Sequence, residues 1–366
     1  MPGTSLRQIE LINFRSYRRL KWHCRPELNI IQGANAAGKT NLLEAIGYLG
    51  CARSLRQQQE TQLLNWGSSF FQIKGVYEDK SAPVEIDIIY HQNHKKLIIN
   101  GQHHRLIELL GLVPVIYFGP DDLNILKGGP AYRRQFLDRE ISIIDRLYCQ
   151  GLQQYRRILL QRNRLLRALK AGRGSRPELE PWNIQLVTTG TAIRERRQSF
   201  LKVLEPETAT IYDRLDGRQR LSFIYRPGAA SSEEWLAKIG ANQEREIQAG
   251  LSLWGPHRDD FSLSIDGHEA RFFASQGQQR SAVLALKIAE TKIFKRVLGK
   301  LPLLLLDDVF SELDNQRQQA LITLLNGAGQ AFITATDLTS LPAGLLAGAA
   351  IWHLSRENGL QAGEGS

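Results

Sequence analysis

One stretch decides the fold: it reads IQGANAAGKTNLLEAIG and occupies residues 31 to 47. Its segment GANAAGKT satisfies the pattern G-x-x-x-x-G-K-[ST], in which small residues let backbone N–H groups close around phosphates. A strand-like run, ELNIIQG, precedes the loop, and TNLLEAIGYLG follows with helical spacing, which is the context this loop requires. The sequence therefore predicts a phosphate-binding P-loop, with its lysine on an exposed part of the loop, made of Gly33, Ala34, Asn35, Ala36, Ala37, Gly38, Lys39 and Thr40.

Two carboxylates complete such a site, and PLLLLDD supplies them at the end of an apolar strand. Asp307 is expected to hold Mg²⁺ with the Thr40 hydroxyl, directly or through water. Asp308 is expected to orient or deprotonate the attacking water. By itself, an apolar strand followed by acids is often only a strand whose acids cap the next helix. The presence of a P-loop in the same chain favours a role for these acids in the nucleotide site.

The number of residues between the P-loop and the acid strand indicates the class of nucleotide-binding protein, because Asp307 lies 267 residues after Thr40. Small GTPases and nucleotide kinases complete their sites in far fewer residues. FFASQGQQRSAVLALKIAE precedes the acids and VFSELD follows them, which is the order of an ABC-type ATPase head. In that class a signature loop completes the site of a partner head, so that ATP lies between two heads. The predicted signature residues are Ser275, Gln276, Gly277 and Gln278.

The middle of the chain is strongly basic. The whole chain has a net charge of +10, and residues 131–200 hold 15 Lys and Arg against six Asp and Glu, a net charge of +9. One-signed clustering favours a polyanionic partner such as DNA, with a solvated helical surface as the alternative. The candidate DNA contacts are Arg156, Arg157 and Arg164.

The same region predicts a helical hairpin. Apolar residues recur from Tyr148 to Leu169 at alternating spacings of four and three, and Arg162 interrupts this seam. A Gly/Pro-rich turn at 171–181 separates it from a returning helix at 186–204, and strands resume in LSFIYRPG, FSLSIDG and LPLLLLDD. Tyr148 and Tyr155 are better explained by packing than by base stacking. We expect an α/β head of residues 1–129 and 251–366, with a helical arm of residues 130–250 inserted in it.

Several segments together resemble the RecF family, the bacterial recombination-mediator ATPases related to Rad50 and SMC heads. They are NFRSY at 13–17, the P-loop, FGPDDLNILKGGPAYRRQFLD at 118–138, GPHRDD at 255–260, FASQGQQR at 273–280 and LLLLDDVFSELD at 303–314. The resemblance covers essentially the whole chain. It implies an ATP- and Mg²⁺-dependent homodimer that binds DNA at gaps or junctions. It also implies action with RecR and RecO to help load RecA, in repair, replication restart and the SOS response.

Two departures from the wider ABC class imply slow hydrolysis. Asp308 stands where transporters have Glu, and TATD places Thr336 where many ABC heads carry a switch histidine. We therefore expect a weak, DNA-stimulated ATPase that acts as a switch. The rival interpretations are an ABC transporter subunit, which would not need the basic helical segment, and an SMC-like linker, which would need a longer coiled coil.

The remaining features exclude several classes. No apolar run reaches the length of a membrane helix and no signal peptide begins the chain, so a cytoplasmic location without membrane contact is expected. The scattered Cys24, Cys51 and Cys149 fit reduced thiols. Arg258 in GPHRDD could contact nucleotide or DNA, or pair with the neighbouring acids. Histidines flank the expected strands and could ligate a metal, although solvated histidines are commoner there: His91, His94, His103 and His104.

Overall fold

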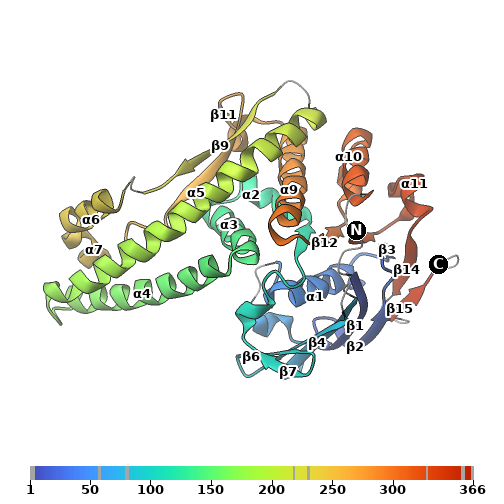
Figure 1. Ribbon diagram of the computed structural model, residues 1–366, viewed down its shortest axis with the longest axis horizontal. Helices are drawn as coiled ribbons and strands as arrows, with labels where there is room; N and C mark the ends of the chain where they lie inside the picture. The colour runs from blue at the N-terminus through green and yellow to red at the C-terminus, as the bar shows by residue number, and fades with distance from the viewer. Residues whose placement is uncertain are drawn as a thin grey trace. The chain divides into compact units, whose positions relative to one another are not determined.

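The structure is a computed structural model that describes residues 5–56, 59–78, 82–216, 219–228, 231–326, 329–355 and 359–363. The chain divides into two compact units, each described here by itself (Figure 1). The first unit combines Met1–Asp122 with Leu284–Ser366, and the second is Leu123–Val283.

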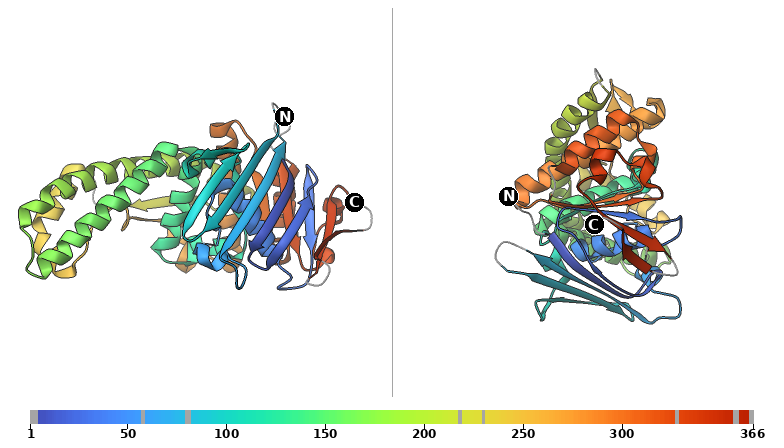
Figure 2. Two further views of the ribbon diagram at one scale, coloured as in Figure 1. Left: turned by 90° about the horizontal axis from the view of Figure 1, so that it is seen from below. Right: turned by 90° about the vertical axis from the view of Figure 1, so that its right-hand side faces the viewer.

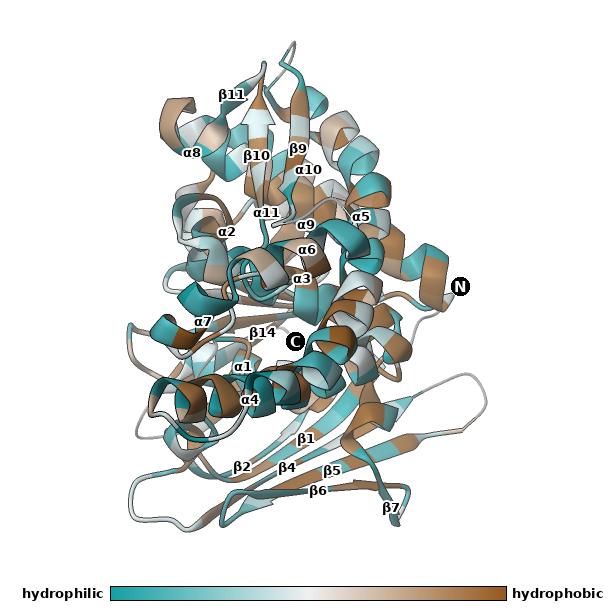
Figure 3. Cartoon of the chain, turned by 90° about the vertical axis from the view of Figure 1, so that its left-hand side faces the viewer, coloured by the Kyte–Doolittle hydropathy of each residue, from teal (hydrophilic) through white to brown (hydrophobic). Residues whose placement is uncertain are grey.

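An antiparallel sheet of six strands forms one layer of the first unit, in the order β2-β1-β4-β5-β6-β7 (Figure 2). Its strands alternate between hydrophobic and hydrophilic residues, as expected when one face of a sheet is buried (Figure 3). Asn100 and Gly101 both have positive φ and form the hairpin turn between β6 and β7, as this residue pair favours. The strands are β1 (Ser5–Phe14), β2 (Tyr17–His23), β4 (Phe70–Glu78), β5 (Val84–His91), β6 (His94–Ile99) and β7 (Gln102–His104).

The second sheet of this unit carries the nucleotide motifs and has the order β15-β14-β3-β13-β12-β8. All its strand pairs are parallel except that of β14 and β15. Because ligands of such sheets bind at the carboxyl ends of the strands, the ends of β3, β12, β13 and β8 define the site. The strands are β3 (Leu28–Gln32), β8 (Val115–Phe118), β12 (Leu303–Asp307), β13 (Gln330–Ala335), β14 (Ala350–Ser355) and β15 (Gly359–Ala362).

Helix α1 (Lys39–Cys51) packs in the same hydrophobic core as both sheets. The predicted apolar positions Leu42, Leu43, Ile46 and Leu49 are fully buried there. This packing holds the helix so that its N-terminus meets the loop after β3. The remaining elements wholly within the unit are η1 (Glu60–Leu63), η2 (Leu106–Leu109), η5 (Phe310–Glu312), α10 (Asn315–Asn326), η6 (Leu338–Ser340) and α11 (Ala343–Leu346).

The second unit is built on the predicted helical hairpin. Helices α4 (Arg146–Lys170) and α5 (Glu180–Asp216) lie side by side and are joined through η4 (Arg176–Leu179) (Figure 1). The seam residues Tyr148 and Tyr155 are buried and their hydroxyl groups are hydrogen-bonded, so they pack rather than offer stacking surfaces.

Arg162, which interrupts the apolar seam, is fully buried. Its guanidinium donates to Asn183 Oδ1 at 2.7 Å, to Ser252 Oγ at 2.7 Å and to Glu246 Oε2 at 2.5 Å. A buried charge is tolerated only when it is paired and hydrogen-bonded, as it is here. The polar position in the seam therefore joins α4 to α5, to α7 (Gln243–Ala249) and to the segment that follows α7.

A three-stranded antiparallel sheet of order β11-β10-β9 completes the second unit. It pairs residues 221–226 with 260–265, which is why this unit continues past the predicted arm of 130–250. Helix α9 (Gln276–Leu298) begins in this unit and ends in the first, and η3 (Pro120–Leu123) ends at the first residue of this unit. The other elements are α2 (Asn124–Lys127), α3 (Pro130–Ile144), β9 (Leu221–Arg226), α6 (Ser232–Ala241), α7 (Gln243–Ala249), β10 (Asp260–Ile265), β11 (His268–Glu269) and α8 (Ala270–Phe273).

Candidate nucleotide site

Residues 33–38 form a tight loop between β3 and α1, and Lys39 and Thr40 begin the helix. Gly38 has a φ of 112°, and a Cβ atom there would lie 2.9 Å from Ser16 Oγ and 3.0 Å from the Tyr17 hydroxyl. A Cβ atom at Gly33 would lie 2.4 Å from the carbonyl oxygen of Leu354. Gly33 is thus required by its close approach to the backbone of Leu354, and Gly38 by its positive φ and the adjacent side chains of Ser16 and Tyr17.

Lys39 lies inside the curve of this loop. Its ammonium donates to the carbonyl oxygens of Gly33 at 2.6 Å and Ala34 at 3.0 Å. The residue is 7% exposed, so the predicted exposed position of this lysine is wrong: its side chain folds back onto the loop, where the ammonium is held by those two carbonyl oxygens. Burial lowers the pKa of Lys39, and the nearby carboxylates of Asp308 and Asp307 act in the opposite direction.

Asp307, at the end of β12, is held by three hydroxyl groups from three elements. Thr40 Oγ1 donates to its Oδ1 at 3.0 Å, Thr334 Oγ1 donates to the same oxygen at 2.8 Å, and the Tyr117 hydroxyl donates to its Oδ2 at 3.0 Å. The side chain is buried, and hydrogen bonds to a carboxylate are among the stronger ones in proteins. The P-loop threonine and the strand acid are therefore adjacent although they are far apart in the chain.

Asp308 leaves the strand in an unusual conformation. Its φ is 52°, in the left-handed region that non-glycine residues seldom adopt. Its N–H donates to Thr334 Oγ1 at 2.9 Å. A single hydroxyl group of β13 thus contacts both acids, and such strained positions concentrate at functional sites.

The supporting residues Tyr117, Thr334 and Tyr17 were not predicted from the sequence. The Tyr17 hydroxyl donates to the carbonyl oxygen of Gly38, and Arg15 pairs with the buried Glu44 of α1 (Nη2–Oε2 2.8 Å). The segment NFRSY, whose role the sequence left open, therefore braces the P-loop and its helix. Within TATD it is Thr334, two residues before Thr336, that contacts the acids.

Comparison with known proteins decides the family. Residues 5–343 match the family model described as the RecF/RecN/SMC N terminal domain. A DNA replication and repair protein RecF from Moorella thermoacetica is 62% identical over 356 residues, which cover 97% of this chain and 96% of that protein. The chain belongs to the RecF family.

Solved structures agree with this assignment. A structure of the recombination mediator protein RecF-ATP in the RecFOR pathway has a TM-score of 0.91 and 30% identity, with 98% of each chain covered. An Smc head domain derived from Pyrococcus furiosus is 15% identical, with a TM-score of 0.55 over 98% of this chain and 96% of that one, and shares the fold alone. The predicted ABC-type ATPase head and the RecF resemblance are confirmed. The chain functions as an ATPase in DNA replication and repair.

The predicted signature loop of this RecF-family chain opens α9 as expected. Ser275 Oγ accepts from the N–H of Gln278 at 3.2 Å, and Gln278 Oε1 accepts from the N–H of Ser275 at 2.7 Å. This reciprocal cap resembles a capping box and fixes the loop at the helix N-terminus. Ser275 and Gln276 are exposed, and the preceding Phe272 and Phe273 are 68% and 71% exposed.

The basic run of the RecF-family arm is only partly a surface. Arg156, Arg157 and Arg164 are exposed on α4, as a DNA-contacting role requires. Other arginines counted in the same charge excess are buried and paired, namely Arg133, Arg162, Arg194 and Arg197. The net charge of the segment therefore overstates the number of cations that meet solvent.

Other candidate residues carry no ligand-binding geometry. No cluster of three His, Cys, Asp or Glu that could hold a metal occurs among the described residues. His104 pairs with Glu108 at 2.7 Å, and Cys24, Cys51 and Cys149 form no disulfide bond. Within the described part of the chain, no helix combines the length and hydrophobicity needed to cross a bilayer.

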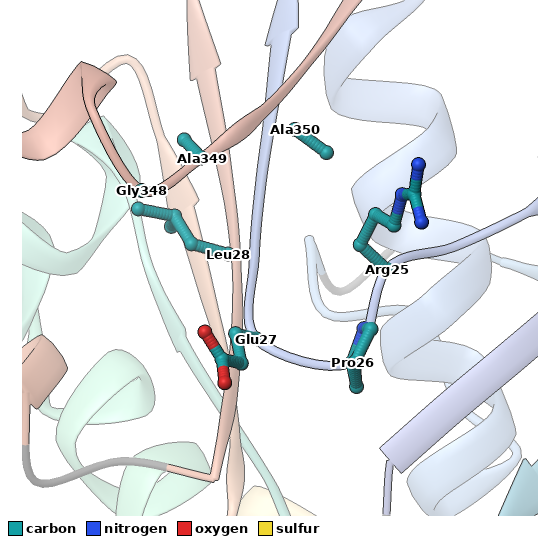
Figure 4. Close-up of a pocket in the computed structure, with 7 residues that line it drawn as sticks. All are labelled: Arg25, Pro26, Glu27, Leu28, Gly348, Ala349 and Ala350. Carbon is teal, nitrogen blue, oxygen red and sulfur yellow. The ribbon is translucent and has the colours of Figure 1, made fainter. Parts of the chain in front are cut away.

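A hollow of about 240 Å³ lies at the amino end of β3 (Figure 4). Because the P-loop follows the carboxyl end of that strand, the hollow is at the opposite edge of the sheet from the nucleotide motifs. Its lining residues are Arg25, Pro26, Glu27, Leu28, Gly348, Ala349 and Ala350.

Proposed function

We propose that this RecF-family chain is an ATP-gated clamp on DNA, in which ATP joins two heads and hydrolysis releases them. The observation that carries the proposal is the arrangement around Asp307. One buried carboxylate is held by hydroxyl groups of the P-loop, β8 and β13, at the carboxyl ends of parallel strands. This geometry suits a phosphate-bound metal ion next to a P-loop.

The donor set fits a magnesium nucleotide. Thr40 Oγ1 and Asp307 Oδ1 lie 3.0 Å apart, and hydroxyl and carboxylate oxygens are ligands that Mg²⁺ prefers. When bound, Mg²⁺ neutralises charge on the phosphate oxygens. The backbone of residues 33–40 donates N–H groups to the phosphates, and Lys39 places its charge near their terminal oxygens. Asp308 orients or deprotonates the attacking water.

The exposed signature loop supports an ATP-dependent homodimer. Ser275 to Gln278 are the residues that would contact the γ-phosphate bound by a second copy of the chain. ADP lacks that group, so it leaves the loop with no anion to bind. ATP therefore acts as the joining ligand, and the RecF-ATP description of a relative supports the choice of nucleotide.

Membership of the RecF family supports the proposed pathway, and the exposed positive charge of the arm supports DNA as the ligand. The RecFOR description of a relative supports partnership with RecR and RecO, and with it assistance in loading RecA at gaps or junctions in DNA and support of the SOS response. The exposed Arg156, Arg157 and Arg164 are the proposed phosphate contacts. Hydrolysis is weak and DNA-stimulated, which an ATPase assay with and without gapped DNA tests.

Sedimentation of three proteins with ATP or ADP tests the clamp directly. The wild type should dimerise with ATP and not with ADP. Asp308→Asn should bind ATP and hydrolyse it far more slowly, so that its dimer persists. Ser275→Arg should bind ATP as a monomer and fail to dimerise, because the larger side chain blocks approach to the phosphate. A Ser275→Arg protein that still dimerises with ATP would refute the sandwich.

A further inference from the structure

Arginines gather around the GPHRDD turn of the second unit, where residues of α3, α4 and α5 meet the start of β10. Some of them pair with aspartates and others do not, and this difference points to a ligand. We call the group the arginine corner; its members are Arg133, Arg134, Arg156, Arg194, Arg197 and Arg258, with Asp138, Asp259 and Asp260.

Three buried arginines occupy the three aspartates. Arg194 holds Asp259 through two bonds of 2.7 and 2.8 Å. Arg133 holds Asp260 in the same forked manner, with both bonds at 2.8 Å, and Arg197 donates to Asp138 at 2.7 Å. Forked pairs of this kind require a specific geometry. Asp259 and Asp260 of GPHRDD therefore serve to hold the elements of this unit together. The alternative that Arg258 pairs with either acid is therefore wrong.

The other three guanidinium groups have no carboxylate of their own. Arg258 is exposed, and within the described residues its side chain makes no hydrogen bond or ion pair. Arg134 is half-buried and donates to the carbonyl oxygen of Asp259 at 3.0 Å, which places it beside Arg258. Arg156 is 55% exposed and reaches Asp138 only at 3.5 Å.

The charges of the corner do not balance, since six guanidinium groups share three carboxylates. Burial lowers the pKa of Arg134, the positive charges of Arg197 and Arg258 act in the same direction, and the carboxylates of Asp260 and Asp138 oppose them. Like charges held together in a partly buried place are stabilised when an anion binds between them. Phosphate is the anion whose geometry suits arginine, because its oxygens accept two parallel N–H bonds.

We propose that Arg134 and Arg258, with Arg156 beside them, form a binding site for a backbone phosphate of DNA. The proposal rests on the DNA-binding function proposed above and assigns residues to it. Arg157 and Arg164 continue the exposed cations along α4, and an extended row of cations suits a polyanion better than a compact ligand. A nucleotide triphosphate offers the same phosphate chemistry and is the competing source.

Titration of a labelled gapped duplex across 0.05–0.3 M salt, followed by anisotropy, tests the site. Each lost phosphate contact should lower the magnitude of the log–log salt slope by about 0.9, equivalent to about 8-fold in affinity at 0.1 M salt. Arg258→Gln should show this loss. The double variant Arg134→Gln, Arg258→Gln should show about twice the change in slope and about a 60-fold loss of affinity. Arg258→Lys should keep the salt slope because it keeps the charge, and it should lose part of the affinity because an ammonium cannot form the two parallel N–H bonds.

Arg105→Gln is the matched control, since that arginine is exposed in the first unit and its neutralisation should leave the slope unchanged. An unchanged slope in folded Arg258→Gln overturns the proposal, and this variant removes no hydrogen bond within the described residues. If Arg258→Gln instead lowers ATP affinity and leaves DNA binding intact, the proposal is also overturned, and the ligand of the site is a nucleotide. A wild type that binds no DNA overturns the proposed function itself.

Discussion

The hydroxyl group of Thr334 offers the sharpest test of the candidate site. Its Oγ1 donates to Asp307 at 2.8 Å and accepts the N–H of Asp308 at 2.9 Å, so one atom positions both acids. Thr334→Val removes this atom and keeps the branched shape that a buried strand position requires. We expect the variant to bind ATP and to hydrolyse it slowly.

The magnitude follows from the two bonds. A hydrogen bond to a charged group contributes about 1.5–3 kcal/mol, and leaving a buried N–H without a partner costs about 1–3 kcal/mol. We therefore expect the free energy of unfolding to fall by roughly 3 kcal/mol. Because Asp308 also loses the bond that holds its backbone at positive φ, kcat should fall about 10- to 100-fold, which corresponds to about 1.4–2.8 kcal/mol.

Steady-state ATPase kinetics and urea unfolding measure the two effects separately. KM should change less than kcat, since the loop backbone and Lys39 remain in place. Thr334→Ser is the matched control because it keeps the hydroxyl group, and its kcat should stay within a few-fold of the wild type. A Thr334→Val enzyme with wild-type kcat would show that the acids need no such positioning, and the role assigned to the Thr334 hydroxyl group would be wrong.

Three further predictions concern single features. Lys39→Ala should abolish ATP-dependent DNA binding, measured by anisotropy, and DNA binding still enhanced by ATP contradicts this. Because the ammonium is buried and makes two hydrogen bonds, urea unfolding should show a loss of about 1.5–3 kcal/mol. Replacing Arg156, Arg157 and Arg164 with Ala should reduce the log–log salt slope of DNA affinity, about −4 to −5, by about 2.7 in magnitude. An unchanged slope would mean that DNA binds at another surface. Arg162→Met leaves Glu246 buried and unpaired, so urea unfolding should show a loss of about 3–5 kcal/mol.

Local motifs made much of the site predictable. The P-loop and the acid strand are continuous in sequence, and each carries its own strand or helix signal. Tyr117 and Thr334 could not be predicted in this way, because they reach Asp307 only through the order of strands β8, β12 and β13. That order is a tertiary property, and no periodicity in the chain specifies which strands lie side by side.

The net charge of residues 131–200 favoured a polyanionic partner, but it could not identify which cations are exposed. A net charge does not say which cations are solvated, and α5 illustrates this, since Arg194 and Arg197 point inward to aspartates. Heptad spacing nevertheless identified the helix pair, because apolar periodicity reports directly on which face is buried. Arg162 interrupts the apolar seam, and the sequence alone did not explain why. Its hydrogen bonds to Glu246, Asn183 and Ser252 show that it joins α4 to neighbouring segments.

His257 gives the second unit a predictable response to acid. Its Nδ1 lies 2.7 Å from the Tyr155 hydroxyl and its Nε2 lies 3.1 Å from the carbonyl oxygen of Ser252. These contacts fit a neutral ring that donates from Nε2 and accepts at Nδ1. Burial lowers the pKa of His257 to about 4, below its ordinary value.

The direction of the pH effect follows from proton binding. Between about pH 6.5 and pH 4 the unfolded chain binds a proton at this histidine and the folded chain does not, so stability falls as the pH falls through that window. The full loss is about 3 kcal/mol below pH 4. Urea unfolding of the wild type and of His257→Gln from pH 7.5 to 4 isolates this contribution as the difference between their profiles, because the other titrating groups are common to both. Parallel profiles would mean that the ring accepts a proton without loss of packing, and the neutral tautomer inferred from Tyr155 and Ser252 would then be wrong.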